Sequence, residues 1–338
     1  MKVLKLPYLA LAHLLRLMTL PDVFMLSFCS RRMKRIIQTI KLKAFKMKFV
    51  FEEAKCIIWI ETMDVKIYPI ISTETIPQFI KKDRPHYFQI GDVKVNHFLE
   101  QIKFHSSHCN IVYLKELENS FEKALVDHAS TFFSNSPVLQ LKTDLNRNLP
   151  TMTGIQEINL SGQYYEGIDD DVETFLSKLP NLNSIHIEFT PKDLDYFSKL
   201  VRIPNLYGYE TDLVKSKVLN FFKGRVAIFS DAICDSDVLK VFLRKWIKYR
   251  LYPNLKILHI DLNQLVPDEL NPLDILENIR TKDWDPNQRP QFFEYEHPIL
   301  GYETTTDCST WIDIEREQDG KLVSVKIEQN CFYFYVWN

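Results

Sequence analysis

The sequence is poor in features that mark several large classes of protein. Only 8 of its 338 residues are glycine, and these stand apart from one another, so a glycine-rich phosphate loop is absent. Its six cysteines are widely spaced without a Cys-x-x-Cys pair. This spacing argues against a zinc knuckle or a disulfide framework and favours a reduced compartment, the cytosol or the nucleus. Nowhere do 18 uncharged apolar residues follow one another, so a membrane span is not expected.

Catalytic and metal-binding patterns are also missing. There is no Gly-x-Ser-x-Gly elbow, and no cysteine is singled out as a nucleophile. His105, His108 and Cys109 form the most metal-like group, but no companion pair completes four ligands. The acids at 169–171 lack the pattern of a calcium loop and are expected at a helix N-terminus, where they favour the helix dipole. We therefore expect no metal, no cofactor and no catalytic activity.

Positive charge is concentrated near the N-terminus. Residues 1–50 contain eleven lysines and arginines against a single acid, Asp22, although the whole chain has a net charge of -2. Three interpretations stay open for this region: phosphate contact, attraction to an acidic partner, or a solvated helix face. A signal peptide is not expected, because Pro7, His13 and Arg16 interrupt the apolar run and no small-residue cleavage site follows.

Hydrophobic spacing predicts three N-terminal helices followed by strands. Leu11, Leu14, Leu15 and Met18 have the spacing of one helical face, and Leu20-Pro21-Asp22 suits the start of a second helix. A third helix is expected through about residue 44. Period-two patterns then predict strands at 49–51, 56–60 and 65–68, and a helix at 119–134 capped by Asn119 or Ser120. Residues 46–135 are thus a strand-rich connecting region.

A degenerate repeat begins near residue 138. Pro-Asn-Leu occurs at 180–182, 204–206 and 253–255, next to strand-like segments that resemble residues 155–160. The spacing lies in the range of leucine-rich repeats, which predicts a divergent repeat-like α/β domain over 136–338. Phe242 and Trp246 are expected in the core of its helix at 242–247. The outward strand positions would form a target-binding face: Asn183, His186, Glu188, Lys256, His259 and Asp261.

His186 and His259 take equivalent positions in two repeat strands. A paired catalytic role is conceivable, but solvent-side positions on a repeat sheet explain both residues. The tail predicts a hairpin, because alternating segments at 311–317 and 322–327 flank the turn at Asp319-Gly320. A further strand is expected at 332–337.

Residues 6–37 resemble an F-box. The shared pattern is a Leu-Pro start, a leucine-rich helix, a short break, and a second helix that ends in the basic cluster at 31–35. Tyr8 and Leu9 replace the usual acid, and Met33 replaces the usual late tryptophan. The resemblance implies a three-helix domain at 1–45. It also implies which residues supply the adaptor contact or the small core behind it: Leu6, Pro7, Leu11, Leu15, Val23 and Leu26.

A unit of about forty residues buries little core alone, so the bulky Phe24, Met25 and Phe28 are expected to fill a partner's groove.

The C-terminal part is similar to the F-box-associated domain of the F-box family that is expanded in nematodes. The similar segments are 233–238, 242–247 and 253–258, followed by the terminal Phe334-Tyr335-Val336-Trp337. The whole chain is thus expected to combine α+β and α/β parts.

The resemblance implies a non-catalytic substrate-recognition subunit of a ubiquitin ligase. The F-box would bind a Skp-type adaptor, and through it a cullin scaffold, while the C-terminal domain holds an unidentified target protein. Ubiquitin transfer would then be accelerated by proximity. The alternative is a nucleic-acid-associated protein that binds through its basic N-terminal segment, although no RNA- or DNA-binding motif accompanies that segment.

Overall fold

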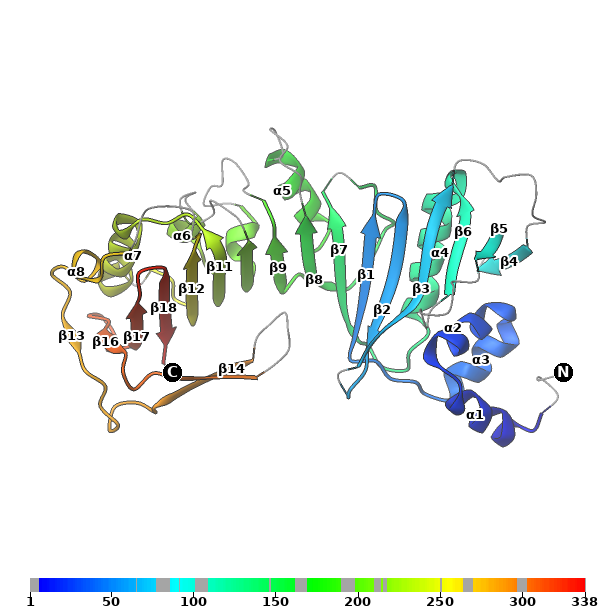
Figure 1. Cartoon of the computed structure of the whole chain (residues 1–338), viewed down its shortest axis with the longest axis horizontal. Helices are drawn as coiled ribbons and strands as arrows, with labels where there is room; N and C mark the ends of the chain where they lie inside the picture. The colour runs from blue at the N-terminus through cyan, green and yellow to red at the C-terminus, as the bar shows by residue number, and fades with distance from the viewer. Residues whose placement is uncertain are drawn as a thin grey trace. The chain divides into compact units, whose positions relative to one another are not determined.

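A computed structural model describes residues 6–337 except 65, 77–85, 91, 101–108, 146, 162–168, 190–197, 210–213, 215–217, 250, 264–269 and 297–302. The chain forms two compact units, residues 1–156 and 157–338 (Figure 1). The division into 1–45, 46–135 and 136–338 stays a prediction, because one compact unit can hold more than one domain.

The first unit begins with three short helices, as predicted. These are α1 (Tyr8–Leu17), α2 (Leu20–Cys29) and α3 (Arg31–Thr39). Thr19 Oγ1 accepts a hydrogen bond from the Asp22 amide at 3.3 Å, and Ser30 Oγ accepts one from Met33 at 3.1 Å, so side chains cap α2 and α3. The third helix ends at Thr39 and not near residue 44, because Lys41 has a positive φ of 58° that interrupts the helical backbone.

A seven-stranded sheet and one long helix complete the first unit. The strands in spatial order are β7 (Val138–Asp144), β1 (Lys46–Glu52), β2 (Lys55–Glu61), β3 (Ile67–Ile76), β6 (Cys109–Leu114), β5 (Val93–Glu100) and β4 (His86–Ile90). The β1–β7 and β3–β6 pairs are parallel, and the others are antiparallel. The three strands predicted at 49–68 are therefore confirmed in β1, β2 and the start of β3.

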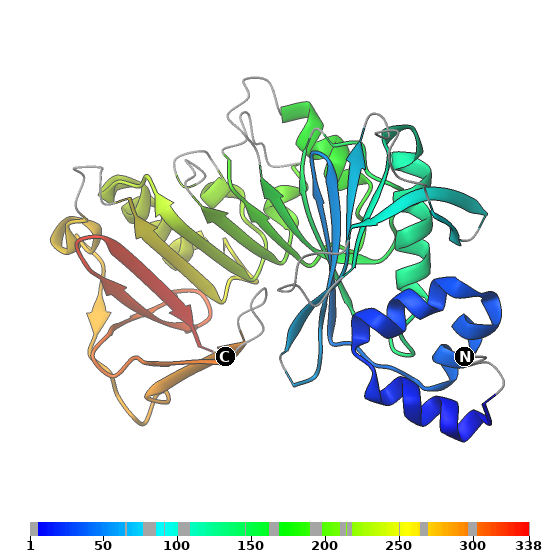
Figure 2. The same cartoon turned by 45° about the vertical axis from the view of Figure 1, so that its right-hand side comes forward.

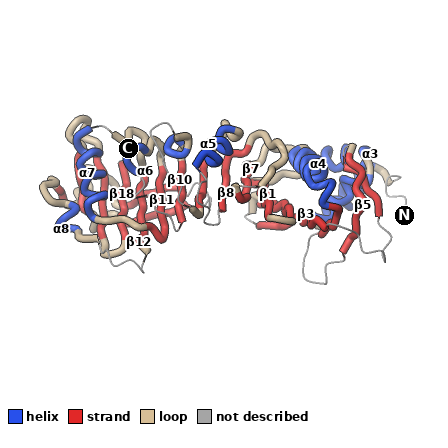
Figure 3. Tube along the Cα trace, turned by 90° about the horizontal axis from the view of Figure 1, so that it is seen from above, coloured by secondary structure: helices blue, strands red, loops and turns tan. Residues whose placement is uncertain are grey.

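The predicted helix at 119–134 is α4 (Glu118–Ser130), preceded by the 3-10 turn η2 (Lys115–Leu117). The helix lies on one side of the first unit's strands (Figure 3), and it buries Phe121, Leu125 and Ala129 completely. Its predicted cap is wrong: the N-cap is Leu117, which has no side-chain cap, and Ser120 Oγ instead donates to the Leu117 carbonyl.

The second unit is built on five parallel strands in sequence order: β8 (Ile155–Ser161), β9 (Ser184–Ile187), β10 (Asn205–Tyr209), β11 (Val226–Ala232) and β12 (Ile257–Leu262). The connections contain α5 (Asp169–Ser177), η3 (Leu200–Arg202), α6 (Val218–Phe221) and α7 (Ser236–Tyr249). Figure 3 shows α5, α6 and α7 on one side of these strands. This order confirms the predicted α/β alternation, whereas a kinship with leucine-rich repeats stays a prediction.

The predicted tail strands extend this sheet. β12 pairs with β18 (Cys331–Val336), which pairs with β17 (Leu322–Ile327), then β16 (Ile312–Glu315) and β13 (Thr281–Lys282), all antiparallel. Gly320 has a φ of 69°, as the tight turn between β16 and β17 requires. α8 (Pro272–Ile275) follows β12, and a separate hairpin consists of β14 (Phe292–Glu296) and β15 (Glu303–Asp307).

The repeated Pro-Asn-Leu tripeptide has a structural role. The Asn205 amide Nδ2 donates to the Asn183 carbonyl at 3.0 Å and to Ser184 Oγ at 3.1 Å. Asn254 Nδ2 donates in the same way to the Lys223 carbonyl at 3.0 Å. Each asparagine therefore satisfies a backbone carbonyl at the entrance to the preceding strand, and the leucine that follows, Leu206 or Leu255, is buried.

The face of the second sheet that carries α7 is closed by aromatic packing. Phe242 and Trp246 are buried, as predicted, and their rings contact Phe334 of β18 at centroid distances of 5.0 and 5.2 Å. The Arg316 guanidinium lies 5.0 Å from the centre of the Trp246 ring and donates two hydrogen bonds to Asp319 in the hairpin turn. The predicted C-terminal hairpin is thus fixed to α7.

We expect Asn205→Ala to destabilise the second unit by about 1–2 kcal/mol, because the change removes a hydrogen-bond partner of the buried Ser184 hydroxyl. Urea denaturation followed by tryptophan fluorescence measures the loss. Asn148→Ala, at an exposed site of the first unit, serves as the control and should change stability by less than about 0.5 kcal/mol. Equal midpoints for Asn205→Ala and the unmodified chain would show that the hydrogen bonds of the Asn205 side chain contribute nothing to stability.

Candidate adaptor-binding and target-binding surfaces

The first helix exposes an apolar surface. Tyr8, Leu9 and Leu17 of α1 are 51%, 80% and 72% exposed, and the preceding Leu6 is 37% exposed. Leu9 and Leu17 are eight residues apart with exposed His13 midway, so they lie on one face of the helix. Bulky apolar side chains gathered on one face of a short helix are typical of a surface that binds another protein. We call Leu6, Tyr8, Leu9 and Leu17 the α1 face.

The six residues that the sequence assigns to the adaptor contact or its supporting core divide between surface and interior. Leu11, Leu15 and Val23 are each 2% exposed, so they form the core behind the α1 face. Leu6 and Pro7 are exposed, and Leu26 is half-buried. Sequence reasoning missed Leu9 and Leu17 as contact candidates. The signal was present, because positions 9, 13 and 17 of a helix face away from positions 11 and 15.

Phe24 and Phe28 are buried within the chain itself, which corrects the expectation that they fill a partner's groove. Both lie in α2 and pack against the end of α4, so the ring of Phe24 contacts Phe28, His128 and Phe132 at centroid distances of 5.1, 5.6 and 5.0 Å. Phe24 is completely buried and Phe28 is 9% exposed. Figure 2 shows the three N-terminal helices beside the end of α4. Met25 is half-buried. The groove that receives the two phenylalanines thus belongs to the chain itself.

A buried histidine stands at the centre of this contact. His128 Nε2 lies 2.6 Å from Ser27 Oγ, and its Nδ1 lies 3.4 Å from Lys34 Nζ. Ser27 Oγ donates to the Phe24 carbonyl. Nε2 therefore donates to the serine oxygen and Nδ1 accepts from the lysine, which describes a neutral ring. Burial, and then the positive charge of Lys34, lower the pKa of His128 to about 3.

The basic cluster does not form one free surface. Lys34 Nζ also donates to Thr131 Oγ1 at 2.9 Å, and Gln38 Nε2 donates to the Thr131 carbonyl at 2.8 Å. Lys46 is buried in β1. The exposed arginines of α3 are Arg31, Arg32 and Arg35. Part of the positive charge noted in the sequence therefore joins α3 to the end of α4.

Because His128 is neutral in the folded chain, we expect the stability of the chain to fall at acidic pH. Below its ordinary pKa of 6.5 the unfolded chain binds a proton, whereas the folded chain does not until about pH 3. The contribution of His128 to the free energy of unfolding is therefore fully present above pH 6.5. It falls as the pH drops from 6.5 towards 3, by at most about 1.4 kcal/mol per pH unit. Urea denaturation between pH 7 and 4 should show a smaller slope for His128→Phe. His13→Phe, at an exposed position of α1, is the control and should keep the original slope.

Of the six predicted target-binding residues, His186, His259 and Asp261 lie within strands on the face of the second sheet opposite to α7. Asn159, His186, Tyr207, Ile228, His259 and Tyr333 occupy one register row across β8, β9, β10, β11, β12 and β18. His186 and His259 are half-buried in this row and three strands apart, or roughly 14 Å at the usual strand spacing. This separation is too large for a catalytic pair. Glu188 and Asp261 are half-buried near the C-terminal ends of β9 and β12.

The neighbourhood of His259 contains the chemical groups of a nucleophilic triad in an unsuitable order. His259 Nε2 and Cys331 Sγ lie 2.8 and 3.2 Å from the same oxygen of Asp261, so the carboxylate separates the imidazole from the thiol. Burial and the hydrogen bond to Asp261 raise the pKa of the Cys331 thiol to about 11. A thiol that stays protonated in this way is not an activated nucleophile.

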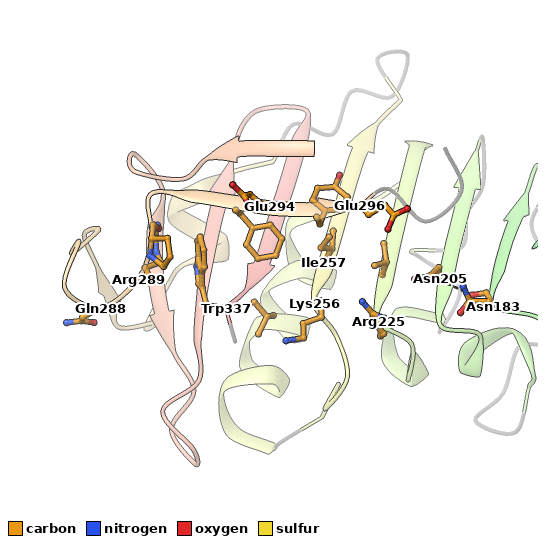
Figure 4. Close-up of a pocket in the computed structure, with 15 residues that line it drawn as sticks. Asn183, Asn205, Arg225, Lys256, Ile257, Gln288, Arg289, Glu294, Glu296 and Trp337 are labelled. Carbon is orange, nitrogen blue, oxygen red and sulfur yellow. Dashed lines mark hydrogen bonds between the residues drawn. The ribbon is translucent and has the colours of Figure 1, made fainter. Parts of the chain in front are cut away.

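A cavity of about 770 Å³ lies at the starts of the parallel strands (Figure 4). Asn183, Asn205, Arg225 and Lys256 line it where β9, β10, β11 and β12 begin. The β14 strand and Trp337 form the opposite wall. Two of the six predicted target-binding residues, Asn183 and Lys256, therefore border the cavity. Sequence reasoning missed Arg225, which precedes β11 as Lys256 precedes β12, because no Pro-Asn-Leu tripeptide marks the start of β11.

A buried ion pair holds the segment that carries this wall. The Arg289 guanidinium donates to both oxygens of Asp313 at 2.9–3.0 Å, and both side chains are almost completely buried. Arg289 also donates to the carbonyl of Cys308 and lies over the ring of Trp337 at 4.8 Å. Ser324 joins Asp313 to the indole of Trp337 through hydrogen bonds of 2.6 and 2.8 Å. Trp337 is thus part of a fixed polar network.

Arg289→Met should destabilise the second unit by about 3–5 kcal/mol, since it leaves the Asp313 carboxylate buried without its cation. Lys282→Met, which removes an exposed ion pair with Glu315 on the neighbouring strand, is the matched control and should cost at most about 1 kcal/mol. Urea denaturation measures both effects, and faster proteolysis between β13 and β16 should accompany the first. Similar small losses in the two variants would contradict the role given to the buried pair.

Other candidate sites from the sequence carry no additional chemistry among the described residues. No group of three or more metal-ligating side chains occurs in the part of the chain that the structure describes. His105 and His108 lie outside the described residues, whereas Cys109 begins β6. The acids at 169–171 begin α5, as predicted. Among the described helices, none has the length and apolar character needed to cross a membrane.

Comparison with known proteins assigns the N-terminal helices to a family. The family model of the F-box domain matches residues 3–45. Curated proteins gave no match to this chain, and solved structures gave none. F-box domains in general bind Skp-type adaptors and occur in non-catalytic substrate adaptors of ubiquitin ligases. The chain thus carries an F-box domain at residues 3–45, built from α1, α2 and α3.

Proposed function

We propose that this chain is a substrate-recognition subunit of a Skp–cullin–F-box ubiquitin ligase. Its F-box binds a Skp-type adaptor, and its second unit binds the target protein. The observation that carries the proposal is the F-box match at residues 3–45, together with the exposed α1 face inside that match.

The α1 face supports docking through apolar contact. Burying one leucine side chain contributes roughly 1.5–3 kcal/mol, so Leu9 and Leu17 together could supply a large part of a micromolar affinity. The face can be covered without unfolding, because Leu11 and Leu15 already form the core behind it. Phe24 and Phe28 stay on α4 in this arrangement.

The role of the second unit is to present a target. Its sheet face opposite to α7 carries the half-buried polar side chains of His186, His259 and Asp261, and the cavity lies at one end of the same strands. We assign this unit to the F-box-associated type on its sequence pattern. In this proposal the catalytic groups lie on other subunits, and transfer of ubiquitin is accelerated because the target is held near them. The complex would act in the cytosol or the nucleus.

The contacts do not favour the nucleic-acid alternative. Lys34 is engaged with α4, and Lys46 is buried. Binding to phosphates would weaken steeply with salt, whereas apolar docking on the α1 face should change little. Measuring adaptor binding in low and high salt separates the two kinds of contact: a steep loss of affinity with salt indicates binding through charges, and a small change indicates apolar docking on the α1 face.

Leu9→Asp and Leu17→Asp should each weaken binding of a purified Skp-type adaptor by at least about tenfold, because a charge would have to be buried in an apolar contact. Isothermal titration measures the affinity. Leu273→Asp, at a position of α8 that is 85% exposed, is the matched control and should bind normally. Leu11→Asp is unsuitable, because Leu11 lies in the core and its replacement would unfold the helices.

Circular dichroism establishes that Leu9→Asp and Leu17→Asp are folded before binding is measured. Unchanged adaptor affinity in both folded variants would refute the assignment of the α1 face. An unmodified chain that binds no Skp-type adaptor would refute the proposed function.

A further inference from the structure

The hairpin of β14 and β15 covers part of the sheet face that the proposed function assigns to a target. Tyr335 alternates along β18 with Phe334, whose ring packs on α7, so the Tyr335 ring lies on the opposite face. Phe293 of β14 is buried against it at a centroid distance of 4.7 Å, in one cluster with the buried Val226 and Ile257. We call β14 and β15 the strap.

The strap is fixed at the end where β14 begins and β15 ends. The Cys308 amide donates to the Gln291 carbonyl at 2.9 Å, beside the buried ion pair of Arg289. The side chain of Thr306 is hydrogen-bonded to Tyr335. β14 crosses the parallel strands (Figure 4), and among the described residues the two strands of the strap pair only with each other.

Towards residue 296 the strap is held less firmly. Tyr295 and Thr304 are half-buried partners, and Thr304 Oγ1 is buried without a hydrogen-bond partner among the described residues. Glu296 lies directly opposite Glu303, and like charges in such a pair destabilise it. β14 also borders the cavity of about 770 Å³, so this part of the strap has few packing contacts to lose.

Opposite charges line the two walls of the cavity. Glu294 and Glu296 line it from β14, whereas Arg225 and Lys256 line it from the starts of β11 and β12 (Figure 4). Their attraction favours a strap that lies against the sheet, and salt weakens that attraction. The strap is therefore held along its length by charges more than by close packing.

We propose that the strap is an autoinhibitory element. It occupies the apolar centre of the target-binding face, and it opens as a unit about its fixed end, which makes Val226, Ile257 and Tyr335 accessible. A target that binds this face competes with the strap. The inference rests on the proposed function for the identity of the competitor, but opening itself needs no other subunit.

Hydrogen–deuterium exchange of the full chain at low salt measures the opening. Glu294→Lys and Arg225→Glu each replace attraction by repulsion across the cavity. Each should speed exchange of the β14 and β15 amides by at least about threefold, while the amides of β10, β11 and β12 keep their protection. The double variant Glu294→Lys/Arg225→Glu restores one attractive pair, so its strap should exchange more slowly than in either single variant.

Glu317→Lys is the matched control, because Glu317 is exposed and does not line the cavity. It should leave exchange of the strap unchanged. The neutral dye Nile red detects the uncovered apolar face, and its fluorescence should be higher with Glu294→Lys than with Glu317→Lys.

Three results would each overturn the inference: unchanged strap exchange in both single variants, loss of protection in the strap and in β10–β12 together, or equal dye fluorescence in Glu294→Lys and the control. Titration of a Skp-type adaptor into the same preparations keeps the two proposals apart. A chain that binds the adaptor but whose strap stays closed refutes only the strap assignment, and a chain whose strap opens but that binds no adaptor refutes the proposed function.

Discussion

The packing of Phe24 against α4 is the interaction on which the first unit depends. A three-helix F-box of about forty residues buries too little surface to be stable by itself. Here α2 places Phe24 between Phe28, His128 and Phe132, and α3 adds hydrogen bonds from Lys34 and Gln38 to Thr131. The F-box is thereby joined to the strand-rich part by apolar and polar contacts, so a protein docked on α1 is held firmly to that part.

In the second unit the two faces of one sheet have different roles. The face against α7 is closed by Phe242, Trp246 and Phe334 and supplies stability. The other face is covered at one end by the segment that Arg289 and Asp313 hold in place, and this arrangement creates the cavity. A buried ion pair is costly to desolvate, so its use here is best understood as fixing the geometry of that segment.

The sequence predicts the order of elements well and their contacts poorly. The caps at Thr19 and Ser30 and the alternation of β16 and β17 are local signals, so the helices and the hairpin follow from short windows of sequence. The partner of Phe24 is not local, because the helix that receives it lies about a hundred residues further along the chain. The apolar character of a side chain predicts that it is buried, but it does not predict which residues it packs against. The cavity was missed for the same reason, since Arg225 and Phe293 come to line it only through tertiary packing.

The most direct test of the account is hydrogen–deuterium exchange of the full chain with and without a purified Skp-type adaptor. We predict that the adaptor protects the amides of α1 around Leu9 and Leu17. The end of α4 around His128 should be unchanged, because it already packs against α2. Protection that is absent from α1, or confined to the basic residues of α3 and β1, would contradict the assignment of the F-box surface.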